Sequence, residues 1–286
     1  LMNSTADLKS PYCVLLSLKR DTMKKSPIFM TICLASAGLG STLANADTIE
    51  VISSGGFYSS MEKLIPLFEK QTGHTVHLSS GSSMGASPTA IPNRLDRGER
   101  FDMVVLAAPE LSKLAEKGYV DPNSQSALVN SSIGMAVPKG APKPDISSAA
   151  KFEKVLLNAK HIGYSASASG THLEKDVFPS FPPVEYKLVS SKAEKVVGDR
   201  VAKRIAEGQF DIGFQQISEI KPFTGQYGQV DLVGPIPAPY QKVTVFAAGI
   251  GKNSEHAKVA KELIKFVKSP QATQIIEEQG LEQVKE

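Results

Sequence analysis

Four short segments rich in Ser, Gly or Gln could supply the donors of an anion-binding site. They are Ser53-Ser54-Gly55-Gly56, Gly81-Ser82-Ser83-Met84-Gly85, Ser167-Ala168-Ser169-Gly170-Thr171 and Gln215-Gln216. Three of them end an apolar run and lead into a predicted helix, so backbone N–H groups and hydroxyls would point outward there. Such donors bind an anion without lysine or arginine. We therefore predict a small-anion site with ligand contacts from Ser54, Gly55, Gly56, Ser82, Ser83, Met84, Ser169, Gly170, Thr171, Gln215 and Gln216.

Two further residues are placed to join this site. His172 directly follows the third segment, at a predicted helix start. It has two interpretations, an exposed helix-start residue or a ligand and proton carrier. Arg200 lies in a helix predicted over residues 192–206 and is expected to reach the ligand. The arginines at 94, 97 and 100 are instead spaced to share one helix face with acidic residues, which is typical of solvated ion pairs.

The Gln215-Gln216 pair lies at a predicted strand end between two apolar residues. Buried amides need hydrogen-bond partners, so the pair is an unusual choice for packing alone. A turn without a functional role is the alternative interpretation.

Metal and hydrolase chemistry are disfavoured by spacing. No two of the five histidines stand four residues apart beside a carboxylate, so we expect neither a metal site nor a cofactor. The segment 81–85 matches the Gly-x-Ser-x-Gly elbow of serine hydrolases, but Pro88 delays the helix that must follow directly.

Residues 1–46 are predicted to be a leader with a secretory signal peptide. A basic pair at 24–25 precedes an apolar stretch over 28–43 and small residues over 44–46. We expect a periplasmic mature chain from about residue 47. Both cysteines, Cys13 and Cys33, would be removed, which argues against disulfides and thiolate chemistry.

The charge of the chain argues against nucleic-acid binding. The formal net charge is +3, and the leader carries all of this excess. The rest of the chain is neutral, so it has no net positive charge to attract a polyanion such as a nucleic acid. We expect a monomer that binds a small anion.

The remaining chain alternates predicted strands and helices, which favours an α/β fold with mostly parallel strands. We predict strands over 48–53, 75–80, 102–106, 133–137, 161–165, 211–214 and 243–249. Helices are predicted after the first strand and over 88–97, from 109, and over 147–158, 192–206, 254–267 and 270–279.

Two long apolar runs, at 133–137 and 243–249, are interpreted as strands that cross between two lobes. Lobe one would then comprise residues 47–131 and 244–286, and lobe two residues 132–243. Open α/β sheets place ligands at the carboxyl ends of their strands, so we expect the cleft between the lobes to hold the ligand.

Several motifs in this order resemble those of periplasmic solute-binding proteins of the molybdate-receptor type. They are Ile91-Pro92-Asn93-Arg94-Leu95 after the serine turn, Phe101-Asp102-Met103-Val104-Val105, Ile212-Gly213-Phe214 and Phe266-Val267-Lys268-Ser269-Pro270-Gln271-Ala272. The resemblance spans nearly the whole chain after the leader. It implies the two-lobed type II periplasmic-binding-protein fold and an oxyanion held by serine hydroxyls, backbone N–H groups and one tyrosine, without metal.

The pocket departs from this family pattern. Gly56 stands where a serine is expected, the serine turn is longer and carries Met84, and Gln215-Gln216 replace the tyrosine. These changes imply more room and a larger carboxylate ligand. The overall pattern is similar to the branch of the family that includes aconitate isomerase.

Two functions therefore stay open. One is cis/trans isomerisation of aconitate by an allylic proton shift, which needs a base and donors for the developing charge. His172, Glu219 and Tyr58 are the candidate bases. The other is a receptor that delivers molybdate or another small oxyanion to an ABC transporter permease.

Overall fold

The computed structural model describes residues 46–285 of the chain. Apart from Ala46, the leader predicted over residues 1–46 lies outside the described residues. Within the described part, no helix combines the length and the apolar character needed to cross a membrane.

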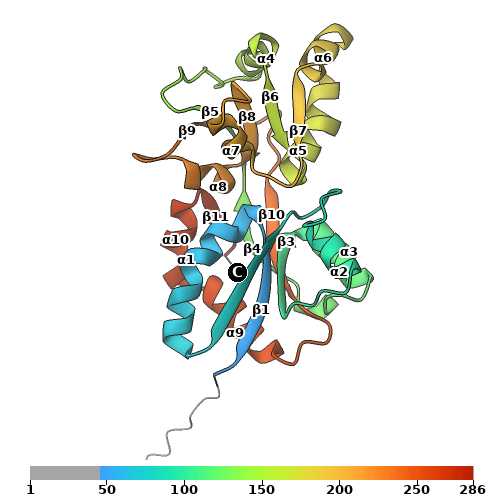
Figure 1. Ribbon diagram of the computed structural model, residues 1–286, viewed down its shortest axis with the longest axis vertical. Helices are drawn as coiled ribbons and strands as arrows, with labels where there is room; N and C mark the ends of the chain where they lie inside the picture. Colours follow the sequence, from blue (N-terminus) through green and yellow to red (C-terminus); the bar gives the residue numbers. More distant parts are fainter. Residues whose placement is uncertain (1–45, 286) are drawn as a thin grey trace, which may run out of the picture. The chain divides into compact units, whose positions relative to one another are not determined.

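The first sheet has six strands in the order β11-β4-β10-β3-β1-β2 (Figure 1). Its strands are β1 (Thr48–Ser54), β2 (Thr75–Gly81), β3 (Met103–Ala107), β4 (Ser126–Ser131), β10 (Thr244–Ile250) and β11 (Leu281–Gln283). β1 pairs in parallel with β2 and β3, whereas β10 is antiparallel to β3 and β4.

Helices pack on both faces of this sheet, because successive side chains of its strands point to opposite faces. Its helices are α1 (Gly55–Thr72), α2 (Ile91–Asp96), α3 (Ala108–Glu116), α9 (Ala257–Val267) and α10 (Pro270–Glu278). Met103 and Val105 of β3 share a core with α1, α9 and α10, while Val104 shares one with α2 and α3. This period of two follows from the pleat of the strand.

The second sheet has five strands in the order β7-β6-β8-β5-β9. Its strands are β5 (Ile133–Pro138), β6 (Ile162–Ser165), β7 (Ala193–Val196), β8 (Ile212–Gln216) and β9 (Val230–Pro235). The helices of this half are α4 (Ala149–Asn158), α5 (Ala168–His172), α6 (Pro183–Ser190), α7 (Val201–Ala206) and α8 (Ile217–Ile220). Figure 1 shows α4 and α6 next to the strands of this sheet.

The predicted α/β class is confirmed, but both sheets are mixed rather than mostly parallel. β5 is antiparallel to β8 and β9, and β11 is antiparallel to β4. The strands β4, β9 and β11 and the helix α6 were not predicted, because their apolar residues are few or interrupted by polar ones.

The predicted helix over residues 192–206 is wrong. Ala193–Val196 form β7, which pairs in parallel with β6, and only Val201–Ala206 are helical. Gly198, with φ of 72°, lies between them. A residue in the left-handed backbone conformation fits neither a strand nor a right-handed helix. The chain therefore turns at this glycine instead of continuing as one helix.

The crossings between the sheets lie outside the two strands predicted to make them. β5 belongs entirely to the second sheet and β10 entirely to the first. The connections are Ser132 and residues 236–243. We propose lobe one as residues 47–131 with 244–286 and lobe two as residues 132–243, because each sheet draws all its strands from one of these sets.

Candidate functional site

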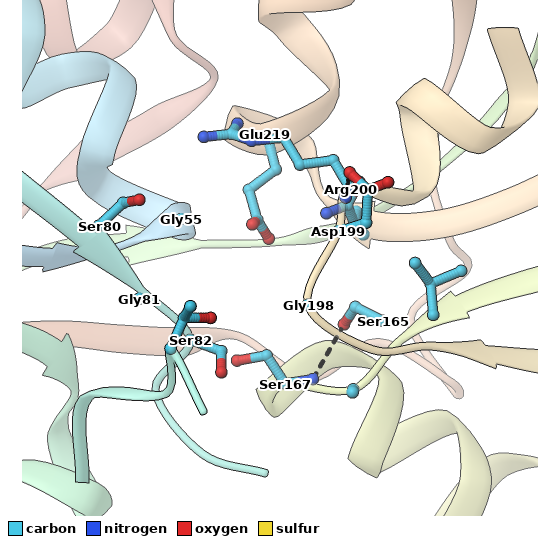
Figure 2. A pocket seen from close by; sticks show the side chains of 14 residues that line it. Gly55, Ser80, Gly81, Ser82, Ser165, Ser167, Gly198, Asp199, Arg200 and Glu219 are labelled. Atoms are coloured by element: carbon cyan, nitrogen blue, oxygen red, sulfur yellow. Dashed lines mark hydrogen bonds between the residues drawn. The ribbon is translucent and has the colours of Figure 1, made fainter. Parts of the chain in front are cut away.

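A cleft of about 320 Å³ is lined by the carboxyl ends of strands from both sheets. Figure 2 shows its lining residues. Lobe one contributes Gly55, Ser80, Gly81, Ser82 and Thr89. Lobe two contributes Ser165, Ala166, Ser167, Val196, Gly198, Asp199, Arg200, Gln215 and Glu219. The lining is therefore rich in hydroxyls and backbone donors, as an anion site requires.

The N-terminus of α1 faces this cleft. The helix is 18 residues long and begins at Gly55, directly after β1. Ser54, its N-cap residue, is 1% exposed, and its Oγ has no hydrogen-bond partner among the described residues. Ser54 and Gly55 also line a cavity of about 30 Å³ that shares Ser82 and Glu219 with the cleft. An unpaired buried hydroxyl beside the positive end of a helix is a ready donor to an anion.

Glu219 brings a carboxyl group into the cleft. It is the third residue of α8 and its carboxylate accepts the backbone N–H of Gln216, as in a helix-capping box. Its Oε1 packs so closely on Gly55 that a Cβ there would lie 2.1 Å away. Burial raises the pKa of Glu219, and Arg200 and the Gln216 N–H only partly oppose this. In Figure 2 the Glu219 side chain points into the space beside Gly55.

Arg200 is the cation of the site. It is the N-cap residue of α7, and its backbone N–H donates to Asp199 Oδ1 at 2.8 Å. Asp199 is itself neutralised by Lys203 and Arg204, at 3.2 and 2.9 Å. The guanidinium of Arg200 forms no ion pair with any described residue, so its charge is available to a ligand.

The two adjacent glutamines have different roles in the structure. Both polar atoms of the Gln216 side chain have a partner: its Oε1 accepts from Ser131 Oγ at 2.8 Å and its Nε2 donates to Thr244 Oγ1 at 3.0 Å. It therefore joins β8 to the ends of β4 and β10, where the chain crosses between the sheets. Gln215 Oε1 accepts the Ala202 N–H at 3.2 Å, and this residue lines the cleft. With Oε1 fixed, Nε2 of Gln215 remains as a donor toward the ligand.

Eight predicted ligand residues are absent from the cleft lining: Ser54, Gly56, Ser169 and Gln216 line the small cavity beside it, and Ser83, Met84, Gly170 and Thr171 line neither. Ser83 is buried, and its Oγ accepts the Ala107 N–H at 3.1 Å at the start of α3. Thr171 donates to Met84 Sδ at 3.5 Å, and both line a different cavity. The longer serine turn thus reaches lobe two beside the cleft rather than inside it.

His172 and Tyr58 are also absent from the cleft lining. His172 Nδ1 lies 2.8 Å from Asp176 Oδ2 and its Nε2 lies 3.0 Å from the Tyr240 carbonyl oxygen. Both ring nitrogens are therefore engaged. Burial and the bonded Glu62 carboxylate raise the pKa of Tyr58. Its phenol is therefore protonated at neutral pH.

At two positions where a ligand glycine was predicted, close packing within the protein explains why the residue is glycine. A Cβ at Gly56 would lie 2.1 Å from Phe246 Cζ, so the Phe246 ring fills the space that the sequence suggested was open to ligand. A Cβ at Gly170 would lie 1.6 Å from the Ser165 carbonyl oxygen. Ser169, beside it, is 1% exposed and its Oγ lies 2.9 Å from Ser165 Oγ.

Sequence analysis missed several lining residues, above all Ser165 and Asp199. Ser165 ends a strand that was predicted, so its position at a carboxyl end could have marked it. Asp199 follows Gly198, and the predicted long helix concealed this turn. Within residues 46–285, no group of three or more His, Cys, Asp or Glu side chains is arranged to hold a metal ion.

The fold defines a two-lobed α/β protein, and the cleft between its sheets is a candidate anion site. Residues 49–282 match the family described as bacterial extracellular solute-binding protein, and the chain belongs to this family. The resemblance inferred from the sequence motifs is thereby confirmed.

Three relatives illustrate the range of this similarity. Aconitate isomerase from Pseudomonas sp. is 37% identical over 262 residues, covering 90% of this chain and 98% of that protein. The periplasmic molybdate-binding protein of Azotobacter vinelandii is 23% identical, with a TM-score of 0.63 over 83% of this chain and 99% of that one. The sulfate-binding protein SubI from Mycobacterium tuberculosis H37Rv is 17% identical, with a TM-score of 0.66 over 83% and 87% of the two chains.

These structural similarities confirm the predicted two-lobed periplasmic-binding-protein fold. The similarity to aconitate isomerase confirms the branch of the family that the sequence pattern indicated.

Proposed function

We propose that this protein binds a small polycarboxylate anion in the cleft and interconverts cis- and trans-aconitate. One observation carries the proposal: the carboxyl of Glu219, with its raised pKa, lies in a cleft that also holds the unpaired guanidinium of Arg200. A general base works best when its pKa lies near the operating pH, which burial of a carboxyl favours. The similarity to aconitate isomerase supports the choice of substrate.

The reaction is a 1,3-shift of one proton. A base removes a proton from the methylene carbon, and the released electron pair forms a new double bond to the central carbon. The former double-bond electrons take up a proton at the old vinyl carbon. Charge and redox state are unchanged, so no oxidant or reductant is needed. The intermediate carries extra negative charge on a carboxylate, which hydrogen-bond donors must stabilise.

The cleft residues divide these tasks. Glu219 is the base that we propose, because it is the carboxyl in the described cleft lining that has no cationic ion-pair partner within 4.0 Å. Arg200 binds a carboxylate that does not react. The N-terminus of α1, with Ser54, receives the carboxylate on which charge develops.

A receptor function is the second candidate. The family comprises extracellular solute-binding proteins, and the molybdate- and sulfate-binding proteins share the fold. In this case the closed cleft delivers the anion to an ABC transporter permease. For either function we propose a periplasmic monomer that is exported by its leader and does not bind nucleic acid or require a metal.

Proton NMR of purified protein with cis-aconitate tests the two candidates. We expect the trans vinyl signal to appear on an enzymatic timescale. Glu219→Gln should lower turnover by about 10² to 10⁴-fold, the usual contribution of a general base. Calorimetry should show that the variant still binds aconitate.

Glu62→Gln is the matched control, because Glu62 contacts Tyr58 on α1 and is absent from the cleft lining. Its turnover should equal that of the parent protein. Aconitate binding without turnover would favour the receptor. Loss of turnover in Tyr58→Phe but not in Glu219→Gln would transfer the role of base to Tyr58.

A further inference from the structure

A second cavity, of about 480 Å³, lies outside the cleft and collects three residues that sequence analysis had assigned to the anion site. These are Met84, Thr171 and His172. Its walls come from the start of α3, from α5 and the π-helical segment Leu173–Val177 after it, and from residues 242–245, which include the first two residues of β10. The volume lies within the range of roughly 300–1,000 Å³ typical of small-molecule sites.

The walls of the second cavity are mainly apolar. Met84, Ala107 and Pro109 contribute from lobe one, together with Val243 just before β10 and Val245 within it. Val243 is 52% exposed although it is a large aliphatic residue. An apolar group placed there would remove this surface from water, and the binding free energy gains about 25 cal/mol for each Å² of apolar surface buried.

The charges around the second cavity are uneven. Its acidic side chains are already engaged: Glu110 pairs with Lys113 at 2.7 Å, and Asp176 with His172 at 2.8 Å. Lys175 and Lys242 also line the cavity, and neither ammonium has an ion-pair partner among the described residues. Two free cations beside an apolar wall are complementary to an anion with an apolar body.

One wall of the second cavity is ordered by direct contacts. The Thr171 hydroxyl donates to Met84 Sδ at 3.5 Å, which joins lobe two to the serine turn of lobe one. His172 is held at both ring nitrogens and its side chain is 14% exposed. These contacts preform one side of the cavity, which reduces the entropy lost when a ligand binds.

We propose that the second cavity binds a small amphipathic monocarboxylate, with its apolar body against Met84 and Val243 and its carboxylate within reach of Lys175 and Lys242. This site is independent of the anion cleft and of the reaction proposed there.

Methionine-methyl NMR with octanoate as the probe tests this site. The described residues include four methionines, and Met61, Met103 and Met135 are fully buried while Met84 is partly exposed. We expect octanoate to shift the Met84 methyl signal saturably and to leave the other three in place. Acetate, without the apolar body, and octan-1-ol, without the charge, should bind at least about tenfold more weakly.

Charge variants complete the test. The double variant Lys175→Gln/Lys242→Gln should weaken octanoate binding about tenfold, since exposed charge pairs contribute about 0.2–1 kcal/mol each. Lys154→Gln/Lys160→Gln, which changes two exposed lysines elsewhere in lobe two, should bind as the parent does. Arg200→Gln should also keep the Met84 shift.

Three results would overturn the proposal. The first is an unmoved Met84 signal at saturating octanoate, and the second is equal binding by the Lys175→Gln/Lys242→Gln variant. The third is loss of the shift in Arg200→Gln, which would place octanoate in the cleft. None of these results depends on whether the protein isomerises aconitate.

Discussion

Two strand-to-helix turns of similar composition face the cleft, yet they satisfy their polar groups in opposite ways. In the turn from β1 to α1, Ser54 Oγ is buried and has no partner among the described residues, and the atoms nearest to a Cβ placed on Gly55 belong to the Glu219 side chain. In the turn from β6 to α5, Ser165 Oγ lies 2.9 Å from Ser169 Oγ and accepts the Gly170 N–H at 3.2 Å. The first turn keeps donors for a ligand, and the second uses them internally.

The difference has a thermodynamic meaning. Leaving a buried hydroxyl unpaired costs about 1–3 kcal/mol, whereas a hydrogen bond within the protein contributes about 0.5–1.5 kcal/mol. The turn before α1 is therefore less stable than its sequence would allow, which is common where a ligand supplies the missing partner. The turn before α5 stabilises the fold and presents few free donors.

The largest expected effect that separates the two turns is a change in stability on replacing glycine. Gly170→Ala should lower the free energy of unfolding by about 3 kcal/mol or more, because its Cβ would overlap the Ser165 carbonyl oxygen. Gly55→Ala should change it by less than about 1 kcal/mol, since its Cβ meets the movable end of Glu219. Urea denaturation of both variants measures these values.

Gly55→Ala should nevertheless lower aconitate turnover by about 10²-fold, as a displacement of the base by about 1 Å does. Equal stability losses in the two glycine variants would show that the turns do not differ as described.

A smaller effect is expected from the serine hydroxyls. Ser169→Ala removes the bond to Ser165 and should lower the free energy of unfolding by about 1 kcal/mol. Ser54→Ala removes an unpaired buried hydroxyl and no bond, so it should raise the free energy of unfolding by about 1 kcal/mol or more. The same change should weaken aconitate binding at least about tenfold in a calorimetric titration. Unchanged affinity in Ser54→Ala would remove this hydroxyl from the site.

The smallest effect concerns pH and tests the Glu219 carboxyl beside the first turn. Its pKa in the folded protein is raised above the ordinary value of 4.5. Below about pH 4 the group is protonated in both the folded and unfolded states and has no effect on their balance. As the pH rises through the raised pKa, ionisation costs more in the folded state, so stability falls.

Glu219→Gln removes this titration. The variant should therefore gain stability relative to the parent as the pH rises above the ordinary pKa of 4.5, when both are unfolded by heat at each pH. Arg200, the Gln216 N–H and the end of α1 face the same carboxyl and limit the gain. A difference that stays constant with pH would contradict the raised pKa.

The strongest sequence predictions concerned elements that local patterns define. A helix was predicted after the first strand, where α1 runs to a glycine with φ of 78°, and the strands β1, β2, β3 and β6 were predicted within one or two residues. Local side-chain spacing and glycine dihedrals decide such features. The composition of the serine–glycine turns also indicated an anion site between two lobes.

The amino-acid sequence alone could not decide which polar groups face the ligand. Ser54 and Ser169 have similar neighbours along the chain, and Gln215 and Gln216 are adjacent. Yet Ser54 Oγ and Gln215 Nε2 have no partner among the described residues, whereas Ser169 Oγ and Gln216 Nε2 each have one. Their partners, such as Ser131 and Thr244 for Gln216, come from distant segments that only the crossing between the sheets brings together. Whether a donor is free depends on these long-range contacts, and the tertiary structure therefore decided the site that the sequence had only located.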